Sequence, residues 1–497
     1  MAERTPSWRE MTKLARSRFG IRVFRPGQRE LIEAVLEGRD AIGVMPTGAG
    51  KSLTFQLPAL VASKPVLVIS PLIALMQDQQ EKLTALGVPA AKLNSSQTAS
   101  EQAQVTEDIE REAFQLIYTT PERLENPEEL QRLKQSGLSL LVVDEAHCVS
   151  QWGHDFRPAY LGLRDACREL GRPPVLALTA TASPTVLADI LRQLDMREPR
   201  VVSTGIDRPN LFFEVLRTPS EDHKRARLLA LLREAPRPGI IYSATVRAAQ
   251  ELHKWLEPHG FRVGLYHGKL GPREREDVQH RFMQDELDLL VATNAFGLGL
   301  DKPNIRLIVH YHFPDSLETY YQEVGRAGRD GEPARVSLLY RLEDKRVQSY
   351  FLGGKYPHRE DTLKVLETLQ PLGTKAWVPL PQLAELAGIS ERHVKVIAAQ
   401  LSDAGLAERK RGRVRLLREL AGAEELAELL LAYETRRSQD RERLDAMMRF
   451  AQSARCRNRL LHDYFEEELQ EDCGHCDNCE AHAAGQPAAG LARAADQ

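Results

Sequence analysis

The chain has 497 residues, of which 42% are hydrophobic and 28% are charged, and its formal net charge is −3. This length is too great for one hydrophobic core and predicts about three or four domains. No apolar run approaches the roughly 20 residues that cross a bilayer, and the first residues lack the apolar stretch of a secretory signal. We therefore expect a cytoplasmic protein without a membrane partner. The near-neutral charge argues against a globally basic nucleic-acid binder and leaves local basic patches for such contacts.

Residues 40–340 alternate short apolar runs with longer amphipathic stretches. The runs are AIGVM, PVLVIS, FQLIYTT, LSLLVVD and PVLALTAT, followed by PGIIYS, FRVGLYH, LDLLVAT, IRLIVHY and ARVSLLY. Continuous apolar runs separated by helical patterns are typical of parallel strands buried on both faces. The series is interrupted near STGIDRPNLFF, where residues 207–210 have the composition of a linker. We expect an α/β fold with two similar parallel-sheet domains, residues 1–207 and 208–356.

A glycine-rich segment, GVMPTGAGKS, follows the first apolar run and precedes a helical pattern. It contains Thr47, Gly48, Gly50, Lys51 and Ser52. Glycines let successive backbone N–H groups face one anion, and the N-terminus of the following helix adds positive potential. Lys51 is expected to reach the β- and γ-phosphates, and Ser52 to supply an oxygen to Mg²⁺. The strand-loop-helix context favours this interpretation over a glycine-rich turn with an incidental lysine.

Two adjacent carboxylates, Asp144 and Glu145, follow the apolar run LSLLVV within the sequence DEAH. Carboxylates at the end of a buried strand are costly unless a divalent cation and a water molecule use them. We assign Asp144 to Mg²⁺ and Glu145 to polarising the water that attacks the γ-phosphate. The alternative, a solvated strand end, is plausible for this motif alone.

The stretch SQWGHDFRPAY, residues 150–160, places an indole, two further aromatic rings, an imidazole and a guanidinium directly after DEAH. Stacking of a base on an aromatic ring contributes about 1–3 kcal/mol and is insensitive to base sequence. Most Trp and Phe side chains instead fill hydrophobic interfaces, and a plug between domains is the competing interpretation.

The segment YYQEVGRAGRDG carries Arg326 and Arg329, three residues apart and hence on one face if the segment is helical. Guanidinium groups from a second domain can stabilise the charge that spreads over the γ-phosphoryl oxygens during hydrolysis. A solvated arginine face is the alternative.

Short helices are expected after residue 356. Residues 380–417 indicate a helix, a turn at Gly388, a second helix capped by Ser390 and a basic hairpin, which together are typical of a winged helix, residues 357–420. The hairpin contains Arg409, Lys410 and Arg411, which are expected to contact DNA phosphates. A solvated charged hairpin is about as plausible. Two long helical patterns follow over residues 421–465, and the Ala/Gly-rich residues 481–497 are expected to be a disordered tail.

Four of the six cysteines lie close together in the sequence near the C-terminal end. They are Cys456, Cys473, Cys476 and Cys479, separated by sixteen, two and two residues. In a reducing compartment this spacing indicates a metal site, and four thiolates suit a structural tetrahedral Zn²⁺. His462 and His475 are expected to be bystanders. We expect residues 421–480 to form a helical zinc-binding module.

The motifs resemble those of superfamily 2 helicases, and the match to the RecQ family is close across residues 10–350. The family's signatures occur in order as FGIRVFRPGQ, GVMPTGAGKS, SPLIALMQDQ, YTTPERL, DEAH, LALTATA, YHGKL, VATNAFGLGLDKPNIRLIVHY and YYQEVGRAGRDG. The sequence CRNRLLHDYFEE with CGHCDNC resembles the family's zinc module. The order differs from the usual one, since the winged-helix pattern precedes the zinc module. This difference leaves open which hairpin separates the strands.

The resemblance implies several further nucleotide contacts. Gln28 is expected to contact the adenine edge with Arg25 packed against the base, which implies ATP as the nucleotide. Gly299 and Asp301 are expected to approach the nucleotide from the second domain, and Gln322 to lie near the γ-phosphate.

The resemblance also implies DNA sensing by the stretch after DEAH. We assign this role to Trp152, His154, Phe156 and Arg157. Thr179 and Thr181 are expected to couple the two domains through hydrogen bonds.

The sequence therefore predicts an ATP-dependent DNA helicase that moves 3′ to 5′ on single-stranded DNA and acts in DNA repair, recombination or replication restart. Its expected cofactors are ATP, Mg²⁺ and Zn²⁺, and its expected partners are single-stranded and forked DNA, with a single-stranded-DNA-binding protein as a further candidate. A monomer is expected. The alternatives are an RNA-directed helicase and an ATP-gated DNA-binding module without turnover.

Overall fold

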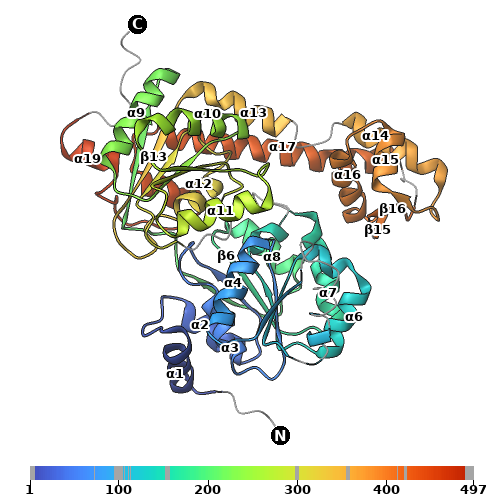
Figure 1. Cartoon of the computed structure of the whole chain (residues 1–497). Coiled ribbons are helices and arrows are strands. Elements are labelled where there is room, and N and C mark those ends of the chain that lie inside the picture. The colour runs from blue at the N-terminus through green and yellow to red at the C-terminus, as the bar shows by residue number, and fades with distance from the viewer. Residues whose placement is uncertain are drawn as a thin grey trace. The chain divides into compact units, whose positions relative to one another are not determined.

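The computed structural model describes residues 6–71, 73–93, 105, 107–109, 111, 113–150, 157–296, 302–353, 359–410, 412–418 and 422–486. The chain divides into two compact units (Figure 1). One unit contains residues 1–344 and 446–497, and the other contains residues 345–445. The second unit is therefore an insertion between two segments of the first.

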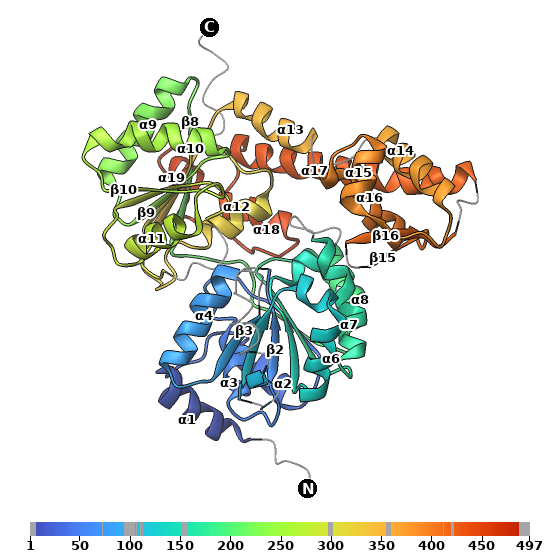
Figure 2. The same cartoon turned by 45° about the vertical axis from the view of Figure 1, so that its right-hand side comes forward.

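The first lobe, residues 6–203, contains among its described residues a seven-stranded parallel sheet with the order β3-β4-β2-β5-β6-β1-β7. Its strands are β1 (Ala41–Val44), β2 (Val66–Ile69), β3 (Ala90–Leu93), β4 (Leu116–Thr119), β5 (Leu140–Val143), β6 (Val175–Thr179) and β7 (Arg200–Ser203). Its helices are α1 (Trp8–Phe19), α2 (Gln28–Leu36), α3 (Leu53–Ala59), α4 (Ile73–Ala85), α6 (Pro127–Ser136), α7 (Leu163–Glu169) and α8 (Pro184–Gln193). Figure 2 shows α4 on one side of this sheet and α6, α7 and α8 on the other.

The core of the first lobe lies on both faces of its sheet. Along β2, Val66 and Val68 pack into one apolar cluster, and Leu67 and Ile69 pack into another. Successive side chains of a strand point to opposite faces, so a strand covered by helices on both sides is apolar throughout. The predicted parallel sheets are confirmed.

The second lobe, residues 211–344, contains among its described residues a six-stranded parallel sheet with the order β10-β11-β9-β12-β13-β8. Its strands are β8 (Leu211–Arg217), β9 (Gly239–Tyr242), β10 (Val263–Tyr266), β11 (Leu289–Ala292), β12 (Leu307–His310) and β13 (Ala334–Tyr340). Its helices are α9 (Glu221–Glu234), α10 (Val246–Leu256), α11 (Pro272–Met283) and α12 (Leu317–Val324). Ser220, Thr245 and Ser316 cap the N-termini of α9, α10 and α12 by accepting a hydrogen bond from the backbone N–H of the third helical residue.

The inserted unit, residues 345–445, has the predicted winged-helix pattern. Its elements are α13 (Lys345–Gly353), α14 (Arg359–Leu369), β14 (Val378–Pro379), α15 (Leu380–Ala387), α16 (Glu391–Asp403), β15 (Ala407–Lys410) and β16 (Arg413–Leu416). The strands form an antiparallel sheet with the order β14-β16-β15. As predicted, α15 ends at Gly388 in the left-handed conformation, and the Ser390 side chain caps α16.

The helices that follow differ from the expectation of two long ones. Within the described residues, α17 (Ala423–Gln452) is long, whereas α18 (Arg457–Tyr464) has only eight residues. The chain leaves the helix after Gln452 and places Cys456 beside the other cysteines of the cluster. A third helix, α19 (Asp477–Ala483), extends past the predicted start of the tail at Ala481, and residues 487–497 lie outside the described part. No helix in the described part is long and apolar enough to cross a membrane.

Candidate nucleotide site and cysteine cluster

The phosphate-binding segment and the two carboxylates lie at the same edge of the first sheet. The segment follows β1, Asp144 follows β5, and β6 pairs with both strands. Because the strands are parallel, the carboxyl ends of β1, β6 and β5 form one edge, where open α/β sheets bind ligands. The fold therefore brings together the two motifs that the sequence separates by about a hundred residues.

Gly48 and Gly50 give the phosphate loop, residues 45–52, its shape. Their φ angles are +86° and +76°, in the left-handed region that favours glycine. A Cβ atom at Gly50 would lie 2.5 Å from Nε2 of Gln28, and one at Gly48 would lie 2.9 Å from Cγ of Arg329. Side chains from two other segments thus pack directly on the loop backbone.

Lys51 has the electrostatic surroundings of a phosphate-binding lysine. Its Nζ donates a hydrogen bond to the Met45 carbonyl at 3.0 Å. Burial lowers the pKa of Lys51, the nearby carboxylates of Glu145 and Asp144 act in the opposite direction, and Arg329 lowers it further. The carboxylates of Asp144 and Glu145 and the guanidinium of Arg329 in the second lobe therefore lie close enough to Lys51 to affect its charge.

Gln28, the first residue of α2, and Arg25, which precedes this helix, contact the phosphate loop. Nε2 of Gln28 donates to the carbonyls of Ala49 and Gly50 at 3.2 and 2.9 Å, and its Oε1 accepts from the Arg25 backbone N–H at 2.8 Å. The Arg25 guanidinium donates to the Gly48 carbonyl. The amide of Gln28 thus fixes the loop in this structure, and its contact with adenine stays a prediction.

The carboxylates after β5 have an unusual local geometry. Glu145 has φ +49°, which is uncommon for a residue with a side chain, and its N–H donates to Oδ1 of Asp144 at 3.0 Å. Burial and the neighbouring Glu145 raise the pKa of Asp144. Oε2 of Glu145 is buried, lies 3.4 Å from Nδ1 of His147 and accepts no hydrogen bond. A buried carboxylate oxygen left without a donor is suited to a cation or a positioned water molecule.

His147 and Thr179 connect this carboxylate to β6. Nδ1 of His147 lies 3.0 Å from Oγ1 of Thr179, and this hydroxyl donates to the Thr181 carbonyl at 3.0 Å. Both contacts lie within the first lobe. The coupling of the two lobes by Thr179 and Thr181 stays a prediction.

The aromatic-rich stretch begins and ends on buried anchors. Oγ of Ser150 donates to Oδ2 of Asp189 at 2.8 Å, and the Arg157 N–H donates to the Cys148 carbonyl at 3.1 Å. The Tyr160 hydroxyl donates to the Asp144 carbonyl at 3.4 Å, which places the end of the stretch beside a catalytic candidate. Trp152, His154 and Phe156 lie outside the described residues.

Arg326 and Arg329 were predicted to lie on one face of a helix if their segment is helical. The part of the segment that carries the two arginines is not helical. Helix α12 ends at Val324, and Arg326 and Arg329 lie in turns around Gly328, which has φ +55°. Arg326 is buried beside Tyr242. Burial raises the pKa of the Tyr242 phenol, and the charge and hydrogen bond of Arg326 act in the opposite direction. Gln322 is half-buried on α12. Gly299 and Asp301 lie outside the described residues.

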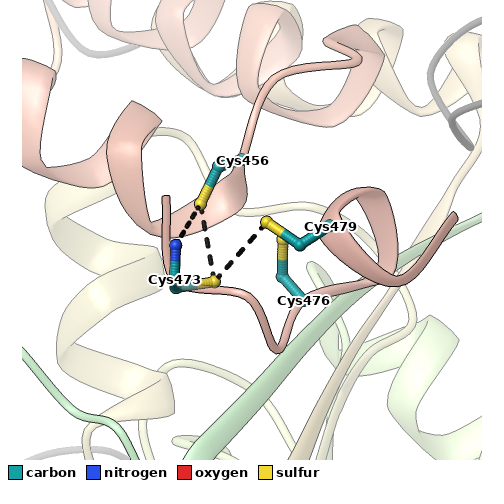
Figure 3. Close-up of side chains that lie close together, drawn as sticks. All are labelled: Cys456, Cys473, Cys476 and Cys479. Carbon is teal, nitrogen blue, oxygen red and sulfur yellow. Dashed lines mark hydrogen bonds between the residues drawn. The ribbon is translucent and has the colours of Figure 1, made fainter. Parts of the chain in front are cut away.

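The side chains of the four clustered cysteines lie close together (Figure 3). Cys456 directly precedes α18, Cys473 and Cys476 precede α19, and Cys479 lies on α19. Their sulfur atoms all lie within 4.8 Å of one another, with 3.4 Å between Cys456 and Cys473 and 3.9 Å between Cys473 and Cys479. Sulfur atoms bound about 2.3 Å from a tetrahedral Zn²⁺ lie about 3.8 Å apart, so the donor set and its spacing fit zinc. His475 contacts the Cys473 carbonyl through Nδ1 and is not among the grouped ligands.

The residues next to the cysteines attach this module to the second lobe. Arg457 is fully buried and forms two hydrogen bonds with Asp477 at 2.8 and 3.0 Å. Oδ2 of Asp477 also accepts from the Val215 N–H at 2.9 Å, at the open edge of β8. Oε2 of Glu467 accepts from the Ile206 N–H at 2.9 Å. An edge strand has unpaired backbone groups, and the module pairs one of them.

The basic residues of the hairpin differ in their contacts and exposure. Arg415 pairs with Glu408 at 2.5 Å and lies over the ring of Trp377 at 4.8 Å, so it serves the hairpin itself. Lys410 is exposed, Arg409 is half-buried, and Arg411 lies outside the described residues.

Comparison with known proteins agrees with this arrangement. The DEAD/DEAH box helicase family matches residues 25–190, the helicase conserved C-terminal domain matches residues 223–331, and the RecQ zinc-binding family matches residues 414–480. A crystal structure of the DUF1998 helicase MrfA bound to DNA and AMPPNP has the same fold, with a TM-score of 0.58 at 19% identity over 84% of this chain and 63% of that one. Two parallel-sheet lobes with these motifs define the chain's class as a two-lobed helicase.

Two curated relatives identify the family. The probable ATP-dependent DNA helicase RecS of Bacillus subtilis is 35% identical over 477 residues, which is 94% of this chain and 92% of RecS. The ATP-dependent DNA helicase RecQ of the same organism is 42% identical over 356 residues, 71% of this chain, and the match spans 60% of that relative. The chain belongs to the RecQ family.

Proposed function

We propose that this protein is an ATP-dependent DNA helicase that moves 3′ to 5′ on single-stranded DNA and unwinds duplexes in repair, recombination or replication restart. The observation that carries the proposal is the convergence of Lys51, Asp144, Glu145 and Arg329 on the phosphate loop. A binding module without turnover does not need a carboxylate that activates an attacking water and an arginine at the same phosphate site. The names of the relatives RecS and RecQ support DNA as the substrate.

ATP occupies the phosphate loop in this proposal. The backbone N–H groups around Gly48 and Gly50 hold the β-phosphate, Lys51 bridges to the γ-phosphate, and Gln28 with Arg25 selects adenine. Glu145 orients and deprotonates the attacking water, and Arg326 and Arg329 stabilise the charge on the γ-phosphoryl group. Gln322, Gly299 and Asp301 complete the nucleotide contacts from the second lobe.

Ser52 and Asp144 would hold Mg²⁺. Asp144, whose pKa is raised by burial and by the neighbouring Glu145, and Oε2 of Glu145, which accepts no hydrogen bond, fit a divalent cation at this place. When bound, the ion neutralises phosphate charge. The zinc proposed for the cysteine cluster is structural, because four thiolates leave no position for a reacting water.

Single-stranded DNA contacts Trp152, His154, Phe156 and Arg157 in this proposal. Because Ser150, Arg157 and Tyr160 anchor this stretch beside Asp144, a strand bound there can change the position of the catalytic carboxylates. Arg409, Lys410 and Arg411 of the basic hairpin contact duplex phosphates without selecting sequence.

Strand displacement on tailed duplexes tests the proposal. We expect ATP-dependent unwinding of a duplex with a 3′ single-stranded tail and little unwinding with a 5′ tail, since the motor moves in one direction. Faster turnover with RNA than with DNA oligonucleotides would favour the RNA-directed alternative.

Glu145→Gln distinguishes turnover from binding. Because the amide cannot accept a proton, we expect ATP hydrolysis to fall about 10²–10⁴-fold while binding of an ATP analogue is retained. Unchanged turnover in this variant would favour the binding-module alternative.

A further inference from the structure

The linker between the lobes, residues 204–210, holds parts of both nucleotide-binding halves through Arg208. The Arg208 guanidinium donates to the Thr47 carbonyl of the phosphate loop at 3.3 Å. It also donates to three carbonyls of the arginine segment, residues 325–332, which carries Arg326 and Arg329. These acceptors are the carbonyl oxygens of Gly325, Ala327 and Gly328 at 3.3, 2.7 and 3.1 Å. One side chain thus joins the two segments that are proposed to face the γ-phosphate from opposite lobes.

Asn210 holds the same segment from the other end of the linker. Its Nδ2 donates to the carbonyls of Gly328 and Glu332 at 2.8 and 3.0 Å. Gly328 has φ +55°, and a Cβ atom there would collide with this amide. The turn between Arg326 and Arg329 is therefore closely fitted to the linker.

The linker is itself fixed two residues upstream. The Ile206 N–H donates to Glu467 of the zinc module at 2.9 Å, and the Ile206 carbonyl accepts from the Tyr321 hydroxyl at 2.6 Å. The backbone N–H and the backbone carbonyl of Ile206 are thus both hydrogen-bonded to side chains of other segments. The position of Arg208 is set by this scaffold as well as by its own hydrogen bonds.

Arg208 is a charged residue whose hydrogen-bond partners are uncharged. Within the described part of the chain, the partners of Arg208 are carbonyls and the Asn210 side chain, and no carboxylate pairs with it. Burial lowers the pKa of Arg208, the neighbouring Tyr321 acts in the opposite direction, and Arg25 lowers it further. Arg208 is half-buried. A partly desolvated cation without a counter-ion costs stability, and such residues concentrate at functional sites.

We propose that Arg208 is a positioning residue for ATP hydrolysis, which holds the arginine segment against the phosphate loop so that Arg329 reaches the γ-phosphate. This inference rests on the proposed ATPase function. Arg208 acts through Arg329 and does not itself touch the reacting atoms. The planar guanidinium has five N–H donors that can span four carbonyls in two segments, whereas a lysine ammonium is a single point with three.

Steady-state ATP hydrolysis of the full chain with single-stranded DNA tests the proposal, using Arg208→Ala, Arg208→Lys and the control Arg247→Ala. Arg247 is a suitable control because its side chain is 89% exposed and pairs only locally with Glu251. For both Arg208 variants we expect kcat to fall by about tenfold or more, while the Kd of an ATP analogue changes by less than about threefold. The lysine variant keeps the charge, so its failure to restore kcat would show that the shape of the guanidinium matters.

A double-mutant cycle separates positioning from a general loss of structure. If Arg208 acts through Arg329, adding Arg208→Ala to Arg329→Ala lowers kcat by less than about twofold further. If the losses in kcat of the two single variants multiply in the double variant, the inference is overturned. It is also overturned if the wild-type protein hydrolyses ATP and the Arg208→Ala variant has the same kcat. A wild-type protein without DNA-stimulated hydrolysis would instead overturn the proposed function, and the inference with it.

Discussion

At the scale of residues, the phosphate loop depends on two conformations that few side chains tolerate. Gly50 has φ +76° and lies against the amide of Gln28, and Glu145 has φ +49° despite its side chain. Such conformations cost about 1–2 kcal/mol for an L-residue with a side chain and persist where the surroundings impose them. At Gly50 the cause is the close approach of Gln28. At Glu145 the conformation accompanies the hydrogen bond of its N–H with Oδ1 of Asp144.

Gly50→Ala tests the close approach. The new methyl would displace the Gln28 amide, so we expect the affinity for an ATP analogue to fall by more than about tenfold. Gly171→Ala is the matched control, since Gly171 has φ +85° but a Cβ atom there would meet nothing within 4 Å. We expect this variant to lose a similar amount of thermal stability with unchanged affinity. Equal affinity losses in both variants would show that backbone strain alone is responsible.

At the scale of elements, the zinc module connects to the second lobe through residues beside its cysteines. Asp477, next to Cys476, pairs with Arg457, next to Cys456, and also accepts from the edge of β8. A metal ion bound by the four cysteines would therefore fix both partners of this buried ion pair. Breaking such a pair is strongly destabilising because one charge stays buried without its partner.

Cys476→Ser tests this coupling. We expect bound zinc to fall from about one ion per chain to near zero and the temperature of unfolding to fall, because the ligand set is incomplete. Cys167→Ser is the control, since Cys167 is buried in the first lobe and lies outside the cluster. Zinc content is measured by atomic emission. Equal zinc contents in Cys476→Ser and Cys167→Ser would contradict the assignment of Cys476 as a zinc ligand.

In the two parallel sheets of the described residues, the sequence predicted ten strands and missed three, all of them at sheet edges. The ten apolar runs named from the sequence correspond to β1, β2, β4, β5, β6, β9, β10, β11, β12 and β13. The missed strands β3 and β7 are the edges of the first sheet, and β8 is one edge of the second. In β7 only Val202 is buried, so the continuous apolar pattern of a covered strand is absent.

The candidate nucleotide site was also predictable from the sequence only in part. Lys51, Asp144 and Glu145 belong to local motifs whose chemistry follows from their residues, and the structure places them together. Arg208 carried no such signal, because its partners are backbone carbonyls of segments about 120 and 160 residues away in the sequence. Contacts of a side chain with backbone atoms leave no pattern of residue types. The non-helical turn around Arg326 and Arg329 was missed for a similar reason, since Asn210 helps to fix it.

At the scale of the whole molecule, the proposed motor has a nucleotide site formed by two lobes, and the stretch assigned to DNA binding follows the carboxylates assigned to catalysis. The winged-helix unit is inserted between residues that belong to the motor unit, and the zinc module returns to the second lobe. The sequence of Bacillus subtilis RecS aligns over 94% of this chain.

The rate of ATP hydrolysis with and without single-stranded DNA tests the central claim most directly. Because Ser150, Arg157 and Tyr160 anchor the aromatic-rich stretch next to Asp144, DNA bound there should promote hydrolysis. We expect stimulation of about tenfold or more with saturating oligonucleotide, and loss of most of it in Trp152→Ala with basal hydrolysis retained. Equal rates with and without oligonucleotide would contradict the account.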